Sequence, residues 1–205
     1  MIHESYPWKE DLLDRKEQIL HFNCPAELKT DDDSVEETAY TYIEKGVFYS
    51  AFIIRKLIDC KSKLSDEADK YAIKVKVYKA KKQFDIYNRY IDEDSHEWQN
   101  PTTKTVQGKD ACNWLIHSFF FFMLYDDRVN QYESFYVASD FDRNKCLYEI
   151  ALSDWLDYIE FIATDEIVRL EMRRDDKTGE RIYTRKQRGK MIFADNIESL
   201  TETNE

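Results

Sequence analysis

One segment, residues 110–125, decides the fold; it reads DACNWLIHSFFFFMLY. Its first half places small and apolar side chains at helical spacing, and its second half is a run of aromatic and aliphatic residues. We therefore expect a short helix over 107–117 that leads directly into a strand over 118–126. Because this strand is apolar on both faces, we expect it to lie at the centre of a sheet with both faces covered.

Further strands are predicted on either side of this segment. We expect strands over 132–139 and 144–150, and the polar loops between them are short enough to require antiparallel pairing as a meander. Upstream, residues 71–78 alternate between lysines and apolar residues. This pattern predicts a strand that has one solvent-exposed face and lies near a sheet edge. Downstream, 167–173 and 181–185 alternate around a polar turn and predict a hairpin.

Helices are predicted mainly in the N-terminal part of the chain. Residues 7–22 begin with a proline, and residues 35–61 repeat apolar side chains at the spacing of one helical face. Gly46 in the longer helix implies either a closely packed neighbour or a bend. A further helix is expected over 154–163, whereas residues 83–105 lack a clear period and are expected to be mostly irregular.

Together these elements predict an α+β fold, in which N-terminal helices pack on a mostly antiparallel sheet made of a meander plus a C-terminal hairpin. We expect a single domain over 1–190, mainly helical over 1–62 and mainly sheet with two helices over 71–186. Residues 191–205 are polar and acidic and are expected to form a partly disordered tail.

The composition restricts the class of protein. The chain has 205 residues and a formal net charge of -11, which argues against broad affinity for nucleic acid or anionic membranes. Its four cysteines are widely spaced and no signal sequence is visible, so we expect a cytoplasmic protein with reduced thiols. The longest apolar run, 119–125, is too short to span a bilayer, and neither membrane association nor a cofactor is predicted.

Polar residues gather where the central helix gives way to the strand. Asn113 and His117 are one helical turn apart and share a face. Pairing of the first two meander strands would bring Ser118 close to Ser139 and Asp140. In one interpretation His117 is a catalytic acid or base, or contacts a ligand, and is oriented by Asn113 or Asp140; Ser118, Ser139 and Asp140 are the candidate ligand-binding residues. In the other, the histidine and asparagine satisfy backbone groups at a helix end.

The helical part distantly resembles the HEPN ribonuclease family. The resemblance rests on the helix that places His117 near its end and on the long helix over 35–61. It implies RNA cleavage in which a polar residue and a histidine act together. The arginine that the family places shortly before its histidine is absent, because Ala111 and Cys112 occupy that window.

The middle of the chain also resembles uncharacterised bacterial α+β proteins. The pattern is Asn-x-x-Ile-His-Ser followed by aromatic residues, and it matches residues 113–118. An aromatic strand that ends in Ala-Ser-Asp over 135–140 and a strand over 147–150 complete it. This resemblance implies a fold and no mechanism.

The remaining polar clusters indicate less chemistry. The other three histidines show no spacing typical of a metal site, and His96 is expected to be a solvated group in a loop. Asp126, Asp127 and Glu133 flank one turn and could hold a divalent cation. A solvated charged turn is the preferred interpretation, and no metal is predicted.

The predicted C-terminal hairpin is basic although the chain is acidic. Arg173, Arg181 and Arg185 are candidate interaction residues, and part of the basic charge is expected to pair across the strands with Glu171 or Glu180. The hairpin is then either a solvated outer surface or a docking surface for an acidic partner, another copy of the chain, or RNA.

Three classes of function follow. The first is an intracellular bacterial protein-interaction or regulatory component without a complete catalytic site, acting in a defence or toxin-control system. It would bind a protein partner or itself, and nucleic acid only through the basic hairpin. The alternatives are a HEPN-like ribonuclease or hydrolase that uses His117, and a small-ligand sensor at the same polar corner.

Overall fold

The structure is a computed structural model that describes residues 2–24 and 33–189. The tail predicted over 191–205 lies outside the described residues. The helices and strands are α1 (Tyr6–Phe22), α3 (Asp33–Asp59), α4 (Asp66–Asp69), β1 (Ala72–Lys79), β2 (Thr102–Gln107), α5 (Gly108–Ile116), β3 (Ser118–Asp126), β4 (Gln131–Ser139), β5 (Cys146–Ala151), α6 (Leu152–Ala163), β6 (Ile167–Arg174) and β7 (Arg181–Arg188).

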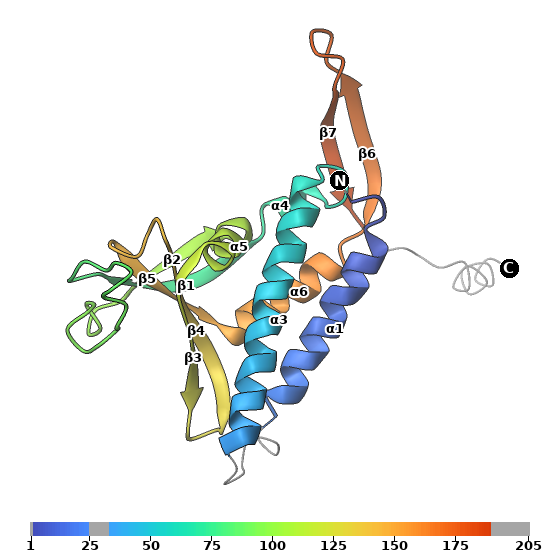
Figure 1. The fold of residues 1–205 in the computed structure, drawn as a ribbon. Coiled ribbons are helices and arrows are strands. Elements are labelled where there is room, and N and C mark those ends of the chain that lie inside the picture. Colours follow the sequence, from blue (N-terminus) through green and yellow to red (C-terminus); the bar gives the residue numbers. More distant parts are fainter. Residues whose placement is uncertain (1, 25–32, 190–205) are drawn as a thin grey trace, which may run out of the picture.

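The fold is α+β, as predicted from the sequence. Helices pack on a five-stranded sheet, and a separate two-stranded hairpin follows. The strand order is β2-β1-β5-β4-β3, and every neighbouring pair is antiparallel. The predicted meander of β3, β4 and β5 is confirmed. Figure 1 shows α1, α3 and α6 together on one side of the sheet, with the hairpin extending away from them.

Helices α1 and α3 approach each other closely at a glycine. A Cβ atom on Gly46 of α3 would lie 2.6 Å from Cγ1 of Ile19 in α1, and Ile19 is fully buried. Only a residue without a side chain fits there while the neighbouring helix stays in place. Close packing by a neighbour, one of the two explanations predicted for Gly46, is therefore confirmed.

A second glycine sets the position of α5 against α6. A Cβ atom on Gly108 would lie 2.3 Å from Cζ of Tyr158, whose buried ring also stacks on Tyr71 at 4.8 Å. Because the ring is held on both sides, we expect Gly108→Ala to lower the free energy of unfolding by about 1–3 kcal/mol. Urea denaturation measures this change. Lys109→Ala is the control, expected to change it by less than about 0.5 kcal/mol; equal losses would contradict the packing argument.

β1 lies near an edge of the sheet, as predicted, but it is not the edge strand. It pairs with β2 on one side and with β5 on the other. β2 includes residues 102–105, which were expected to be irregular. Lys74 and Lys76 are exposed on one face of β1. The alternation of polar and apolar side chains identifies the solvent-exposed face of a strand, but it does not show how many strands pair with it.

The predicted central position of β3 is wrong. β3 is the last strand of the sheet, although both of its faces are partly covered. Phe121 packs on Phe48 of α3, with ring centroids 4.8 Å apart, and Phe120 packs on Phe84 with centroids 4.9 Å apart. Phe84 belongs to the loop over 80–101. A loop therefore covers the second face of β3, and burial of both faces did not require a central position.

Two apolar clusters lie on opposite faces of the sheet. The larger one fills the space between the sheet and the helices, and includes Trp155 and Tyr158 of α6. The smaller one lies under the loop over 80–101 and consists of Tyr78, Phe84, Phe120, Ala138 and Leu147. Within the described ranges, no helix combines the length and the apolar character needed to cross a bilayer.

Candidate functional site

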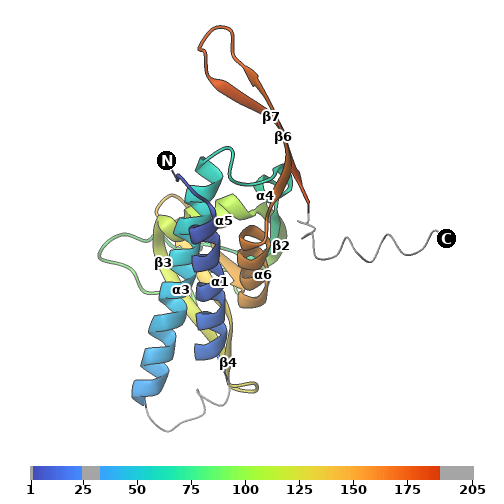
Figure 2. The same ribbon diagram turned by 90° about the vertical axis from the view of Figure 1, so that its right-hand side faces the viewer.

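The β6–β7 hairpin is built by local turn chemistry. In the turn, the Asp175 side chain accepts hydrogen bonds from the backbone amides of Lys177, at 2.8 Å, and Thr178, at 3.3 Å. The amide of Gly179 bonds the Asp175 carbonyl at 2.8 Å. The strands on either side pair in antiparallel register from Ile167 with Arg188 to Arg174 with Arg181. The predicted hairpin is confirmed, and Figures 1 and 2 both show it projecting from the body.

A buried carboxylate fixes the base of the hairpin to the body. Asp165 is fully buried and accepts hydrogen bonds from the amide and the hydroxyl of Ser65, at 2.7 and 2.6 Å. Arg188 of β7 lies 3.4 Å from the same carboxylate. Ser65 is also the N-cap of α4, where its hydroxyl accepts from the amide of Ala68. The hairpin and the short helix therefore share one polar centre.

A second contact ties β7 to α4. Lys186 is buried, and its ammonium group contacts the carboxylates of Asp69 and Asp66. Its backbone amide also donates to Asp66 at 2.9 Å. On the other side, the amide of Gly189 bonds the carbonyl of Glu166 at 3.1 Å. With its base held from two sides, the hairpin presents its outer part in a fixed direction (Figure 2).

The outer part of the hairpin combines positive charge with exposed apolar side chains. Residues 167–188 contain eight basic and four acidic residues in a chain of net charge -11. Two of the basic residues, Lys186 and Arg188, are paired at the base, which leaves six basic and four acidic residues in the outer part, 169–185. Val168, Leu170 and Met172 alternate along β6 and are 52%, 38% and 50% exposed. Leu170 and Met172 have the spacing that places side chains on one face of a strand, whereas the pairing of β6 with β7 is irregular at Val168. The hairpin thus offers an apolar stripe bordered by cationic groups.

The three predicted interaction residues differ in their partners. Arg185 lies 3.9 Å from Glu171, which also pairs with Arg169 at 3.0 Å. The predicted charge pairing with Glu171 is therefore confirmed. Arg173 and Arg181 make no ion pair with any residue in the described ranges 2–24 and 33–189. These two guanidinium groups are available to an external anionic group.

A groove continues from the hairpin onto the body, and sequence reasoning missed it. It has a volume of about 860 Å³ and contains more cationic than anionic groups. Its one acidic group, Asp59, is already paired with Arg55. The residues could not be grouped beforehand because they come from three separate parts of the chain. They are Ile2, His3, Trp8, Phe52, Lys56, Asp59, Cys60, Lys61, Ser62, Lys63, Arg181 and Tyr183.

The backbone of the predicted polar corner comes together at the start of β3. Ser118 pairs with Ser139 across β3 and β4, and the amide of Asp140 donates to the carbonyl of His117 at 3.0 Å. The helix-end position of His117 follows from its own amide, which bonds the carbonyl of Asn113 at 3.0 Å. These four positions and Asn113 are therefore neighbours in space.

The side chains of this corner point to other partners. Asn113 accepts from Nε of Arg55 at 2.9 Å instead of orienting His117. Asp140 pairs with Arg143 at 2.8 Å. Ser139 donates to Asp142 at 3.0 Å. The His117 side chain is exposed, and no described residue forms a hydrogen bond or ion pair with its ring. A general base needs a neighbour that fixes its orientation, and this arrangement does not supply one.

The acidic turn after β3 is neutralised from within the chain. Nε of Arg128 lies 2.9 Å from Oδ1 of Asp126. The side-chain and backbone hydrogen bonds from Arg128 lower the pKa of Asp126 to about 2. Among residues 2–24 and 33–189, no group of three or more histidine, cysteine or acidic side chains has an arrangement that could hold a metal ion.

A polar network on the helix-free face of the sheet was not predicted. Glu149 accepts from the Tyr78 hydroxyl at 2.5 Å and from Nζ of Lys76 at 2.8 Å. Burial of Tyr78, followed by its bond to Glu149, raises the pKa of the tyrosine. Glu149 lines an open pocket of about 470 Å³ together with Ser134 and Tyr136. The sequence feature that could have indicated this network is Glu149, an acidic residue among the apolar residues of β5.

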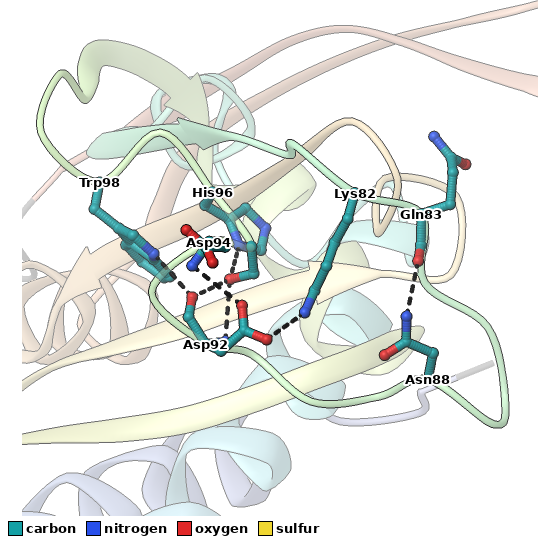
Figure 3. A network of polar contacts seen from close by, with 8 residues as sticks. Lys82, Gln83, Asn88, Asp92, Asp94, His96 and Trp98 are labelled. Atoms are coloured by element: carbon teal, nitrogen blue, oxygen red, sulfur yellow. Dashed lines mark hydrogen bonds and ion pairs between the residues drawn. The ribbon is translucent and has the colours of Figure 1, made fainter.

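The loop over 80–101 encloses His96, which was wrongly expected to be solvated (Figure 3). His96 is fully buried, with Nδ1 2.9 Å from the Ser95 hydroxyl. Its ring stacks on Phe84, with centroids 5.4 Å apart. Burial, followed by the charge of Lys82, lowers the pKa of His96 to about 4. Nε2 has no hydrogen-bond partner among the described residues.

The polar residues around His96 hold the loop closed. Lys82 pairs with Asp92 at 2.5 Å, and the indole N–H of Trp98 donates to the Asp92 carbonyl at 3.0 Å (Figure 3). The side chain of Asn88 donates to the Gln83 carbonyl at 3.3 Å. This segment therefore covers the smaller apolar cluster as an ordered structure, despite its lack of helices or strands.

Comparison of the chain with protein-family models, with curated proteins and with solved structures found no match in any of the three cases.

Proposed function

We propose that this chain is a protein-interaction module whose β6–β7 hairpin binds an acidic surface on a partner protein. The observation that supports this best is the projecting hairpin itself. It is fixed at its base by Asp165 and Lys186, and its outer part has an excess of basic residues in an acidic chain.

The chemistry of the outer hairpin suits a protein interface. Arginine, methionine and aromatic side chains are enriched in the cores of protein interfaces. Arg173 and Arg181 have no internal ion pair among the described residues, and Met172 and Val168 are about half exposed. Because the base is already ordered, binding would cost less conformational entropy than the folding of a free loop.

The wider setting is part of the same proposal. We infer a regulatory component inside a bacterial cell, acting in a defence or toxin-control system. The acidic body would suit a basic toxin or nuclease in the same assembly, because opposite charge promotes association. The polar corner at His117 offers weaker support for an enzyme, since Asn113 is bonded to Arg55.

Site-specific photo-crosslinking tests the hairpin. A photoreactive residue at Met172 should give a discrete protein adduct in cells that naturally make the chain. The same residue at Phe141, an 80% exposed position on the body, is the matched control and should not. Equal adducts at both positions would contradict the proposal.

Charge reversal tests the chemistry of the same contact. Arg173→Glu, Arg181→Glu and Arg185→Glu together should abolish the Met172 adduct, while Lys74→Glu, Lys81→Glu and Lys104→Glu on the body should leave it intact. Retention of the adduct in the hairpin variant would reject the charge argument. A labelled single-stranded RNA, titrated against both variants, decides whether the hairpin binds nucleic acid instead.

A further inference from the structure

The free edge of β3 lacks the features that normally prevent strands from pairing between molecules. β3 pairs with β4 alone among the strands of residues 2–24 and 33–189. Its nine residues include no lysine and no proline. The irregularities in its pairing lie at its two ends, between Ser118 and Phe120 and between Leu124 and Tyr125. Natural edge strands usually carry lysine, proline or bulges, or are very short; β3 has nine residues, and its irregularities leave Phe120 to Leu124 regularly paired and uncharged.

Phe122 is the middle residue of β3, which runs from Ser118 to Asp126. It lies in the part of the strand, Phe120 to Leu124, whose pairing with β4 is regular. An antiparallel partner strand centred on Phe122 would therefore lie opposite all nine residues of β3.

Each end of β3 carries one charged group without an ion pair among the described residues, and the two groups have opposite charge. At its beginning, the guanidinium group of Arg89 lies 5.0 Å from the ring centre of Phe119, whereas the neighbouring Arg143 is paired with Asp140. At its end, Asp127 is exposed, whereas Asp126 is paired with Arg128. An antiparallel copy of the same strand would place each end beside its opposite, whereas a parallel copy would place like charges together.

We propose that β3 pairs antiparallel with β3 of a second copy of this chain, with Phe122 at the twofold axis. This register places Ser118 opposite Asp126 of the other copy, and His117 opposite its Asp127. The two five-stranded sheets join into one continuous sheet. Twofold contacts of this kind use the same surface on both subunits and close after two copies.

This pairing would bury apolar surface that is now exposed. Phe122 is 41% exposed and would face its own counterpart across the axis. Directly opposite aromatic residues stabilise antiparallel pairs. A second copy of β3, paired antiparallel, places groups of opposite charge together at both ends of the edge.

Light scattering during a dilution series of the full chain tests the pairing. We expect a dimer that dissociates on dilution. Phe122→Lys should weaken it at least about tenfold, because a lysine at the centre of an edge opposes pairing. At a dilution where both proteins are monomeric, its melting temperature should equal that of the wild type, since residue 122 is 41% exposed. A wild-type chain that remains monomeric at every concentration would overturn the proposal.

A charge-swap cycle tests the orientation. Asp127→Arg and Arg89→Asp should each weaken the dimer, and the double variant should regain most of the lost affinity, because the swap restores opposite charges at each contact. Two single variants that each dimerise like the wild type would reject the antiparallel arrangement.

A disulfide trap tests the register. Phe122→Cys, with Cys24, Cys60 and Cys146 replaced by serine, should form a covalent dimer under mild oxidation. Opposed residues in antiparallel strands lie about 4.5–5.5 Å apart between Cα atoms, within disulfide range. Phe141→Cys in the same background should remain monomeric, and equal rates would reject this register. The hairpin variants should dimerise normally, so this proposal and the proposed function fail independently.

Discussion

Replacing Asp165 with alanine is expected to lower the free energy of unfolding by about 3–5 kcal/mol, the usual cost of removing one partner from a buried ion pair. The fully buried carboxylate accepts from the amide and hydroxyl of Ser65 and contacts Arg188. Without it, the Ser65 amide loses its partner in a site that water does not reach. Urea denaturation with linear extrapolation measures the loss.

Two control variants make this prediction specific. Asp165→Asn keeps the shape and one acceptor oxygen, so it should cost less, about 1–3 kcal/mol. Asp157→Ala, on the exposed face of α6, should change the stability by less than about 0.5 kcal/mol. If Asp165→Ala costs no more than Asp157→Ala, the carboxylate does not hold the hairpin. Hydrogen exchange of the β7 amides should rise in Asp165→Ala before that of β4, because the base of the hairpin opens first.

The second large effect is a loss of stability in mild acid through His96. The pKa of His96 is about 4 in the folded chain, below its value of about 6.5 in an unfolded chain. Between these values the unfolded chain binds a proton that the folded chain does not. Stability is therefore complete above about pH 6.5 and falls as the pH decreases toward 4. We expect this histidine to contribute about 1–3 kcal/mol to the fall.

Comparison of variants separates His96 from the carboxylates that titrate in the same range. His96→Phe keeps a ring against Phe84 and Trp98 but cannot bind a proton. Thermal unfolding at a series of pH values should show a shallower loss for His96→Phe than for the wild type. His117→Phe, at an exposed position, should leave the slope unchanged. Identical slopes in all three proteins would mean that His96 does not sense pH.

Local periodicity was sufficient to predict most of the elements. The apolar face of α3 and the alternation in β4 and β6 are properties of adjacent residues, so each could be inferred from its own segment. β2 could not, because its sequence TTKTVQ is polar and exposed. Its strand conformation comes from pairing with β1. The predicted position of β3 was wrong for a related reason. The apolar side chains of β3 indicate that its faces are covered, but they do not indicate how many strands pair with it.

The candidate sites were predictable only where they lie within one segment. The basic hairpin was visible because its arginines are close in sequence. The corner around His117 was placed correctly in its backbone, since the short loop after β3 fixes the register of Ser118 with Ser139. Its side-chain contacts were not predictable, because Asn113 binds Arg55 from a distant helix. The same holds for Tyr78 with Glu149, 71 residues apart.

The contact between Ser65 and Asp165 has a consequence for how the protein is made. Its two halves are 100 residues apart, so a ribosome completes α4 long before it adds the carboxylate that will bind the amide of Ser65. Chains of this size begin to fold from the N-terminal side during synthesis. The helices α1 and α3 can therefore associate before the side chain that binds the Ser65 amide has been synthesised. The β6–β7 hairpin acquires its fixed direction only when Asp165 and Arg188 have both left the ribosome.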